Sequence, residues 1–163
     1  MGNLLLFALA ASTAATTPPD LVRLTNPHHA FAVRQSLVGA VTRMEDARCQ
    51  QVLSDFRDTA GRTLRENLDT RGQTPAGFIG GILFYDGDLF ATCRKDAGRV
   101  HAFTSPGSRV VFVCGERFYD GWRRKPQWGE LVLLHEALHS MGLGENPPSS
   151  DVITAHVAWS CGR

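Results

Sequence analysis

Gly129-Glu-Leu-Val-Leu-Leu-His-Glu-Ala-Leu-His-Ser-Met141 is the stretch that decides the fold, because it carries the pattern HExxH in a run without proline. Nothing in this run before Gly142 would break a helix, so we expect a helix over residues 128–142. One face of that helix is apolar and should be buried. It consists of Leu131, Val132, Leu134, Leu138 and Met141. The stretch therefore predicts a helix in the core of the domain.

Three polar side chains lie within this apolar helix at a spacing that suits a metal ion. His135 and His139 are four positions apart, so their side chains lie on one helix face and can bind one ion together. Glu136 follows His135 directly and can reach a water molecule on that ion. These residues predict a Zn²⁺ site with Glu136 as the catalytic general base. The alternative is a pair of core histidines hydrogen-bonded to their neighbours.

The residues after the helix offer a third ligand. Gly142 can adopt a positive φ, end the helix and reverse the chain direction. Glu145 lies six positions after His139, and its carboxylate would complete a three-ligand site with one open position. Two alternatives are Asp151, just past the Pro-Pro pair, and His156, on the inner face of a predicted last helix. We favour Glu145 because it lies next to the glycine turn.

The complete motif, HExxHxxGxxE over residues 135–145, resembles the metzincin motif HExxHxxGxxH. It departs from that motif in having Glu as its last residue, and no Met follows Met141 to form the methionine turn. The stretch HExxHxxGLGENPPSS is also similar to a group of small secreted bacterial zincin-like proteins of largely uncharacterised function. That likeness extends upstream to residues 102–108 and 111–114.

The resemblance implies an α+β, zincin-like domain in which a small, mostly antiparallel sheet packs on the HExxH helix, with N-terminal and C-terminal helices. It also implies one Zn²⁺ per chain and a secreted metallopeptidase that hydrolyses peptide bonds in a peptide or protein substrate. Two other functions fit the same residues. One is a non-catalytic secreted zinc-binding interaction domain, and the other is a zinc amidase acting on a non-protein, cell-wall amide.

Several further residues could serve a peptidase. Tyr119, Tyr85 and His156 could stabilise an oxyanion, although a tyrosine is more often simply packed and hydrogen-bonded. A strand over residues 100–104 could hold an extended peptide at its edge, unless that edge is covered. His28 and His29 lie in a Pro-containing N-terminal segment, where we expect exposed and inert side chains.

The chain has 163 residues, which fits one domain. Residues 1–17 resemble an export signal, with the apolar run Leu4–Ala10 followed by small residues, although a disordered or core segment is the alternative. We expect a linker at 18–27 and the folded domain at 28–163, in a secreted or periplasmic monomer. The net charge of +1 argues against nucleic acid or a membrane surface as the main partner.

Four cysteines are an even number, and in an exported chain they predict two disulfides. Three pairings are possible, of which we favour Cys93–Cys114 and Cys49–Cys161. No CxxC spacing occurs, which argues against a structural zinc cluster.

The remaining segments alternate between helix and strand patterns. Apolar residues at helical spacing predict a helix over 31–48, and residues 52–58 could be a strand or a helix. A short strand is expected at 82–85, and a hairpin at 100–104 and 109–114 around Ser105-Pro-Gly-Ser108. A helical turn at 118–124 and a helix at 151–160 follow. The predicted class is α+β, with a small sheet packed on the helix at 128–142.

Overall fold

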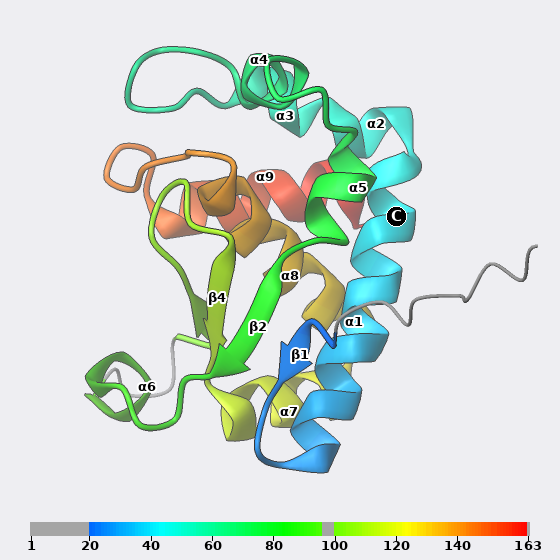
Figure 1. Cartoon of the computed structure of the whole chain (residues 1–163), viewed down its shortest axis with the longest axis vertical. Coiled ribbons are helices and arrows are strands. Elements are labelled where there is room, and N and C mark those ends of the chain that lie inside the picture. The colour runs from blue at the N-terminus through cyan, green and yellow to red at the C-terminus, as the bar shows by residue number, and fades with distance from the viewer. Residues whose placement is uncertain (1–19, 96–99, 163) are drawn as a thin grey trace, which may run out of the picture.

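The computed structural model describes residues 20–95 and 100–162, and these residues form an α+β domain (Figure 1). The predicted export signal lies outside the described residues. The strands are β1 (Val22–Arg23), β2 (Leu83–Asp86), β3 (Ala102–Phe103) and β4 (Val110–Val113). The longer helices are α1 (Pro27–Glu45), α7 (Gly115–Arg124), α8 (Pro126–Ser140) and α9 (Ser150–Cys161). The shorter ones are α2 (Ala47–Gln50), α3 (Val52–Asp55), α4 (Leu64–Asp69), α5 (Pro75–Ile79) and α6 (Ala91–Lys95).

The sheet has the strand order β1-β2-β4-β3 and is mixed. β1 pairs with β2 and β2 with β4 in parallel, whereas β3 and β4 pair antiparallel. The expectation of a mostly antiparallel sheet was therefore wrong. Parallel neighbours need a long crossover connection, and α1 to α5 supply one between β1 and β2. Only the predicted hairpin between β3 and β4 has the short connection that antiparallel pairing allows.

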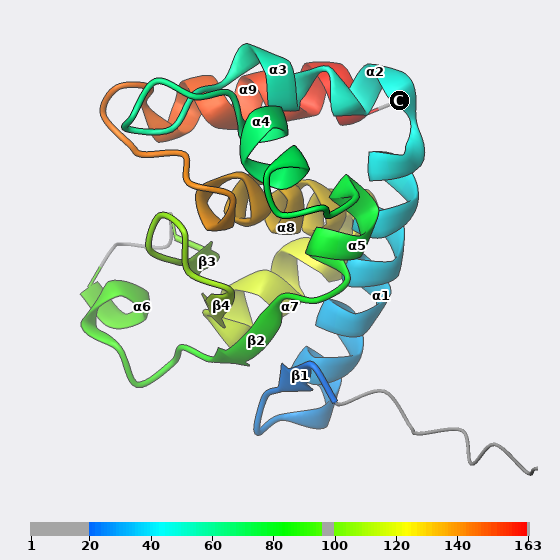
Figure 2. The same ribbon diagram turned by 45° about the horizontal axis from the view of Figure 1, so that its top comes forward.

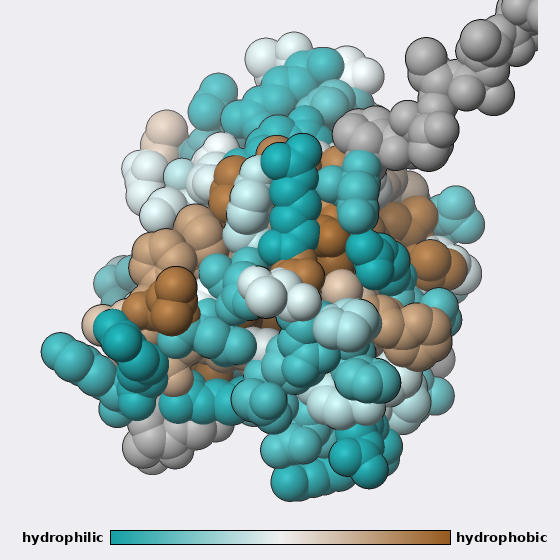
Figure 3. All heavy atoms as spheres, turned by 60° about the horizontal axis from the view of Figure 1, so that its bottom comes forward, coloured by the Kyte–Doolittle hydropathy of each residue, from teal (hydrophilic) through white to brown (hydrophobic). Residues whose placement is uncertain are grey.

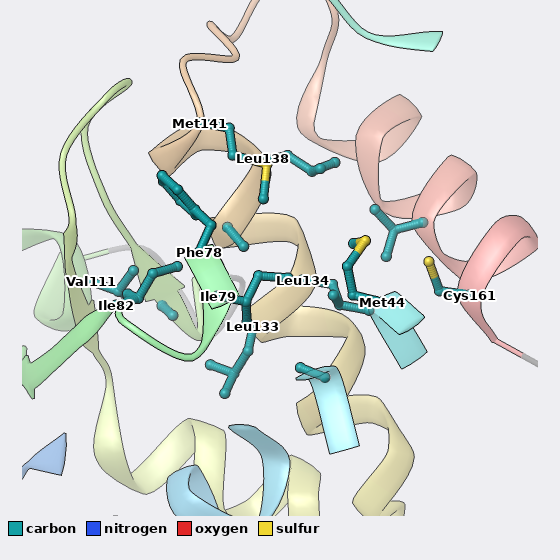
Figure 4. Close-up of a cluster of buried hydrophobic side chains, with 14 of the residues drawn as sticks. Met44, Phe78, Ile79, Ile82, Val111, Leu133, Leu134, Leu138, Met141 and Cys161 are labelled. Atoms are coloured by element: carbon teal, nitrogen blue, oxygen red, sulfur yellow. The ribbon is translucent and has the colours of Figure 1, made fainter. Parts of the chain in front are cut away.

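α8, the helix with the HExxH pattern, lies at the centre of the helical layer. It packs against α1, α7 and α9 and also contacts β3 and β4 (Figure 2). Its close approach to α1 depends on Gly129, because a Cβ at that position would clash with the hydroxyl of Ser36. The buried side chains of α8 meet those of α5, the sheet and α9 in one core (Figure 4). This core includes Met44, Phe78, Ile79, Ile82, Val111, Leu133, Leu134, Leu138, Met141 and Cys161.

α1 begins and ends where its capping residues dictate. Asn26 accepts a hydrogen bond from the backbone N–H of His28, and Pro27 occupies the first turn. Asp46 is extended, and its carboxylate accepts from Arg48 and Cys49, which starts α2. The predicted helix at 31–48 thus begins earlier and is interrupted at Asp46. Residues 52–55, for which both strand and helix were open, are helical.

The other predictions of local structure hold with shifted bounds. The strand at 82–85, the hairpin, the helix at 128–142 and the last helix are confirmed as β2, β3–β4, α8 and α9. The helical turn at 118–124 is part of the longer α7. Val22 and Arg23, within the predicted linker, form β1, and α5 and α6 lie where the sequence pattern predicts no helix.

The cysteines pair as predicted. Cys49 and Cys161 join α2 to α9, and Cys93 and Cys114 join α6 to the start of α7. Within the described ranges, no helix has both the length and the apolar character needed to cross a membrane. The face seen in Figure 3 is mostly hydrophilic, with apolar residues in small separate patches. Such scattered apolar residues are ordinary on a protein surface.

Candidate metal centre

α8 brings His135, Glu136 and His139 together in its last two turns. The three residues are buried, at 8%, 6% and 6% exposure respectively. The Nε2 atoms of His135 and His139 face each other at 3.1 Å. The spacing on the helix predicted this arrangement, and the structure has it.

The other ring nitrogen of each histidine has its own partner. Nδ1 of His139 lies 2.9 Å from the main-chain carbonyl of Leu143, and Nδ1 of His135 lies 3.1 Å from the hydroxyl of Thr154 on α9. Metal-binding histidines usually engage their second nitrogen in this way, which fixes the ring and leaves the first nitrogen for the metal. Both Nε2 atoms are therefore oriented by contacts outside α8.

The chain turns sharply after α8 at Gly142, as the motif predicted. Gly142 has a φ of 120°, which residues with a side chain rarely adopt, and its N–H donates to the carbonyl of His139. The same carbonyl accepts from Gly107, in the turn of the β3–β4 hairpin, at 2.9 Å. Asn67 donates to the carbonyl of Met141, and Asp58 pairs with Leu143 in an isolated β-bridge. Hydrogen bonds from the β3–β4 hairpin on one side, and from Asn67 and the Asp58 segment on the other, therefore fix the turn.

Burial favours the neutral forms of His135 and Glu136 when no cation is present. Burial, and then the charge of Glu145, raise the pKa of Glu136 to about 8. Burial, and then His139, lower the pKa of His135 to about 4. A neutral imidazole is the form that binds metals. Within the described residues, neither a cation nor a hydrogen-bond donor pairs with the carboxyl group of Glu136.

The two histidines fit a zinc ion. Zinc binds imidazole nitrogen at about 2.0–2.1 Å in tetrahedral geometry, which places two such nitrogens about 3.3 Å apart. The observed separation of 3.1 Å is close to this value. Among residues 20–95 and 100–162, however, no third His, Cys, Asp or Glu joins the two histidines in a group that could hold a metal.

The three predicted third ligands differ in their surroundings. Glu145 is exposed on the loop after Gly142, and its charge acts on Glu136. Asp151 is exposed in the first turn of α9. His156 lies 2.8 Å from the carboxylate of Asp55 and packs on a neighbouring aromatic ring. Of the three, only Glu145 interacts with a residue of the HExxH pattern, and its role as a ligand stays a prediction.

The two tyrosines contact residues outside the HExxH pattern. Tyr119 packs on His28 and His29 and stacks on Trp122, between α7 and α1. The hydroxyl of Tyr85 accepts a hydrogen bond from an arginine of β1. The structure does not bring either ring into contact with the HExxH residues. The expectation that His29 is exposed was wrong, because α1 starts early enough to bury its ring against α7.

Sequence reasoning missed the residues that orient the site. Thr154, Asn67 and Asp58 belong to no motif, and the contact of Leu143 uses only its backbone. Their roles depend on how α9 and α4 pack, for which local sequence carries no signal. No protein-family model, curated protein or solved structure matches this chain.

Proposed function

We propose that this protein is a secreted zinc-dependent endopeptidase with Glu136 as its general base. One observation carries the proposal. Among the described residues, the buried carboxyl group of Glu136 has no hydrogen-bond or ion-pair partner, and Glu136 directly follows one of two histidines whose Nε2 atoms converge. A buried carboxylate is costly unless a cation or donors compensate it. A purely structural metal site has no need of such a carboxylate, whereas a hydrolase does.

The ligands we propose are His135, His139 and Glu145, around one Zn²⁺ ion per chain. A bound zinc ion would supply Lewis acidity toward the substrate carbonyl and lower the pKa of water near it. The 3.1 Å separation of the two Nε2 atoms supports the first two ligands. The third ligand is proposed from the position of Glu145 in the motif, six residues after His139 and just past the Gly142 turn.

The role we propose for Glu136 is proton transfer. A nearby cation favours the ionised form of a carboxylate, so Glu136 would be deprotonated in the loaded enzyme despite its burial. It would then accept a proton from the attacking water and donate it to the leaving amine. Burial keeps bulk water away from this exchange and strengthens its electrostatics.

We propose an extended peptide as the substrate, because the sheet has an edge strand that packs against α8. β3 is the edge strand next to β4, and it packs against α8. As an edge strand, β3 would offer backbone groups with which an extended substrate can pair. The two disulfides support export, because such bonds persist in oxidising compartments.

The test is cleavage of casein and of a peptide library by zinc-loaded protein, with Glu136→Gln as the inactive variant. The exposed Glu45→Gln is the matched control, since Glu45 lies at the far end of α1. We expect cleavage by the wild type and the control, and loss of at least about a hundredfold in Glu136→Gln. Equal cleavage by Glu136→Gln would contradict the mechanism. Zinc binding without any cleavage would favour the non-catalytic domain or an amidase.

A further inference from the structure

Thr154 is the one side chain from outside α8 that contacts a histidine of the HExxH pair through a hydrogen bond among the described residues. Its hydroxyl can either donate or accept a hydrogen bond. The partner of His139, the carbonyl of Leu143, can only accept. The two histidines therefore have outer partners of different chemistry.

This difference assigns the protons of the metal-free pair. Because a carbonyl accepts, His139 carries its proton on Nδ1, and its Nε2 presents a lone pair. The 3.1 Å contact between the two Nε2 atoms is a hydrogen bond only if His135 donates from Nε2. The Nδ1 of a neutral His135 is then an acceptor, and the Thr154 hydroxyl donates to it.

A metal-bound His135 needs the opposite arrangement. Its Nε2 must offer a lone pair, so the proton belongs on Nδ1, where Thr154 now has to accept. One proton moves from Nε2 to Nδ1 of His135, and the total on the two rings stays at two. If the partner of His135 Nδ1 could only accept a hydrogen bond, the proton of His135 would stay on Nδ1. The Nε2 lone pairs of His135 and His139 would then face each other in the metal-free protein.

We propose, on the basis of the function proposed above, that Thr154 is a positioning residue whose hydroxyl reverses its hydrogen bond when metal binds. It stabilises one tautomer of His135 in the metal-free protein and the other in the loaded protein. The position of Thr154 is set by α9. Ile153 and Val157 bury the inner face of that helix, and Cys161 ties its end to Cys49.

The first test compares zinc affinities by chelator competition at one pH. Thr154→Val keeps the shape of the side chain and removes the hydroxyl, whereas Thr154→Ser keeps the hydroxyl. We expect Val to weaken zinc binding about tenfold or more, and Ser to restore it to within about threefold of the wild type. Thr42→Val is the matched control, because the Thr42 hydroxyl bonds only a carbonyl of its own helix. An unchanged affinity in Thr154→Val would overturn the inference and leave the proposed function standing.

The second test reads the tautomers directly from ¹⁵N chemical shifts of the two histidines. We expect Nε2–H for His135 and Nδ1–H for His139 without metal, and Nδ1–H for both with zinc. Nδ1–H on His135 in the metal-free wild type would overturn the inference. If the wild type binds no zinc, the proposed function is wrong and so is the reversal of the Thr154 hydrogen bond. This outcome is distinguishable from the others, because the wild type is measured before any variant.

Discussion

The side-chain amide of Asn67, on α4, donates a buried hydrogen bond of 3.1 Å to the main-chain carbonyl of Met141 at the end of α8. The same amide donates to the carboxylate of Asp58 at 2.9 Å. Both partners border the Gly142 turn, so α4 holds the segment that carries Leu143 toward His139. A helix with no residue in the motif thus shapes the candidate metal centre.

Replacement of Asn67 by Ala should destabilise the protein by about 1–3 kcal/mol, because it leaves the Met141 carbonyl buried without its donor. The measurement is the free energy of unfolding in urea. Gln51→Ala is the control, since Gln51 is exposed and its side chain makes no capping hydrogen bond, and it should change stability by less than about 0.5 kcal/mol. Equal stabilities for the two variants would contradict the role given to Asn67.

Gly142→Ala should lower both stability and zinc affinity. Its φ of 120° is strained for alanine, and the new Cβ would lie 3.3 Å from Asn67 and from Asp58. We expect a loss of about 1–3 kcal/mol, together with weaker zinc binding because the Leu143 carbonyl would shift away from His139. Gly144→Ala is the matched control, since its φ is not in the positive region. Chemical unfolding and zinc titration of both variants check the prediction. Wild-type stability and zinc affinity in Gly142→Ala would refute it.

Asp58 should stabilise the protein at neutral pH and lose this effect in acid. The Asn67 hydrogen bond, and then those of Arg62, lower its pKa from 3.8 to about 2 although burial opposes them. A carboxyl group with a depressed folded-state pKa stabilises above its unfolded pKa, and the contribution disappears as pH falls through the folded one. The stability difference between wild type and Asp58→Ala should therefore shrink between about pH 4 and pH 2. Urea unfolding at several pH values measures it, and a constant difference would contradict the prediction.

The two disulfides should contribute unequally to stability. Cys49–Cys161 spans 112 residues and Cys93–Cys114 spans 21. In the chain-entropy model these loops correspond to about 4.8 and about 3.3 kcal/mol. Double Cys→Ser variants of each pair, compared by urea unfolding, should rank in that order. The Cys49/Cys161 variant should also bind zinc more weakly, since it frees the end of the helix that carries Thr154. The reverse ranking would mean that loop length does not determine their effect.

The parts of the fold that could be predicted from the sequence are those with local signals. The α8 helix and the β3–β4 hairpin follow from periodicity and turn residues, and the pairing of the two histidines follows from their helical spacing. The disulfide pairing was one of three possibilities and was chosen correctly.

The parts that could not be predicted depend on contacts between distant segments. β1 has only two residues, and its parallel pairing with β2 exists because α1 returns the chain along the sheet. His29 is buried because Gly115 leaves room for its ring at the start of α7. Thr154 reaches His135 only through the packing of α9 on α8. Periodicity within one segment carries no information about such contacts.

The zinc content of the purified, oxidised protein tests the central claim most directly. It is measured for the wild type, Glu136→Gln and His139→Ala, after zinc has been supplied and unbound metal removed. The account predicts one zinc per chain in the wild type and in Glu136→Gln, and loss of zinc in His139→Ala. A wild type without zinc, or a His139→Ala variant that retains it, would contradict the metal centre at the end of α8.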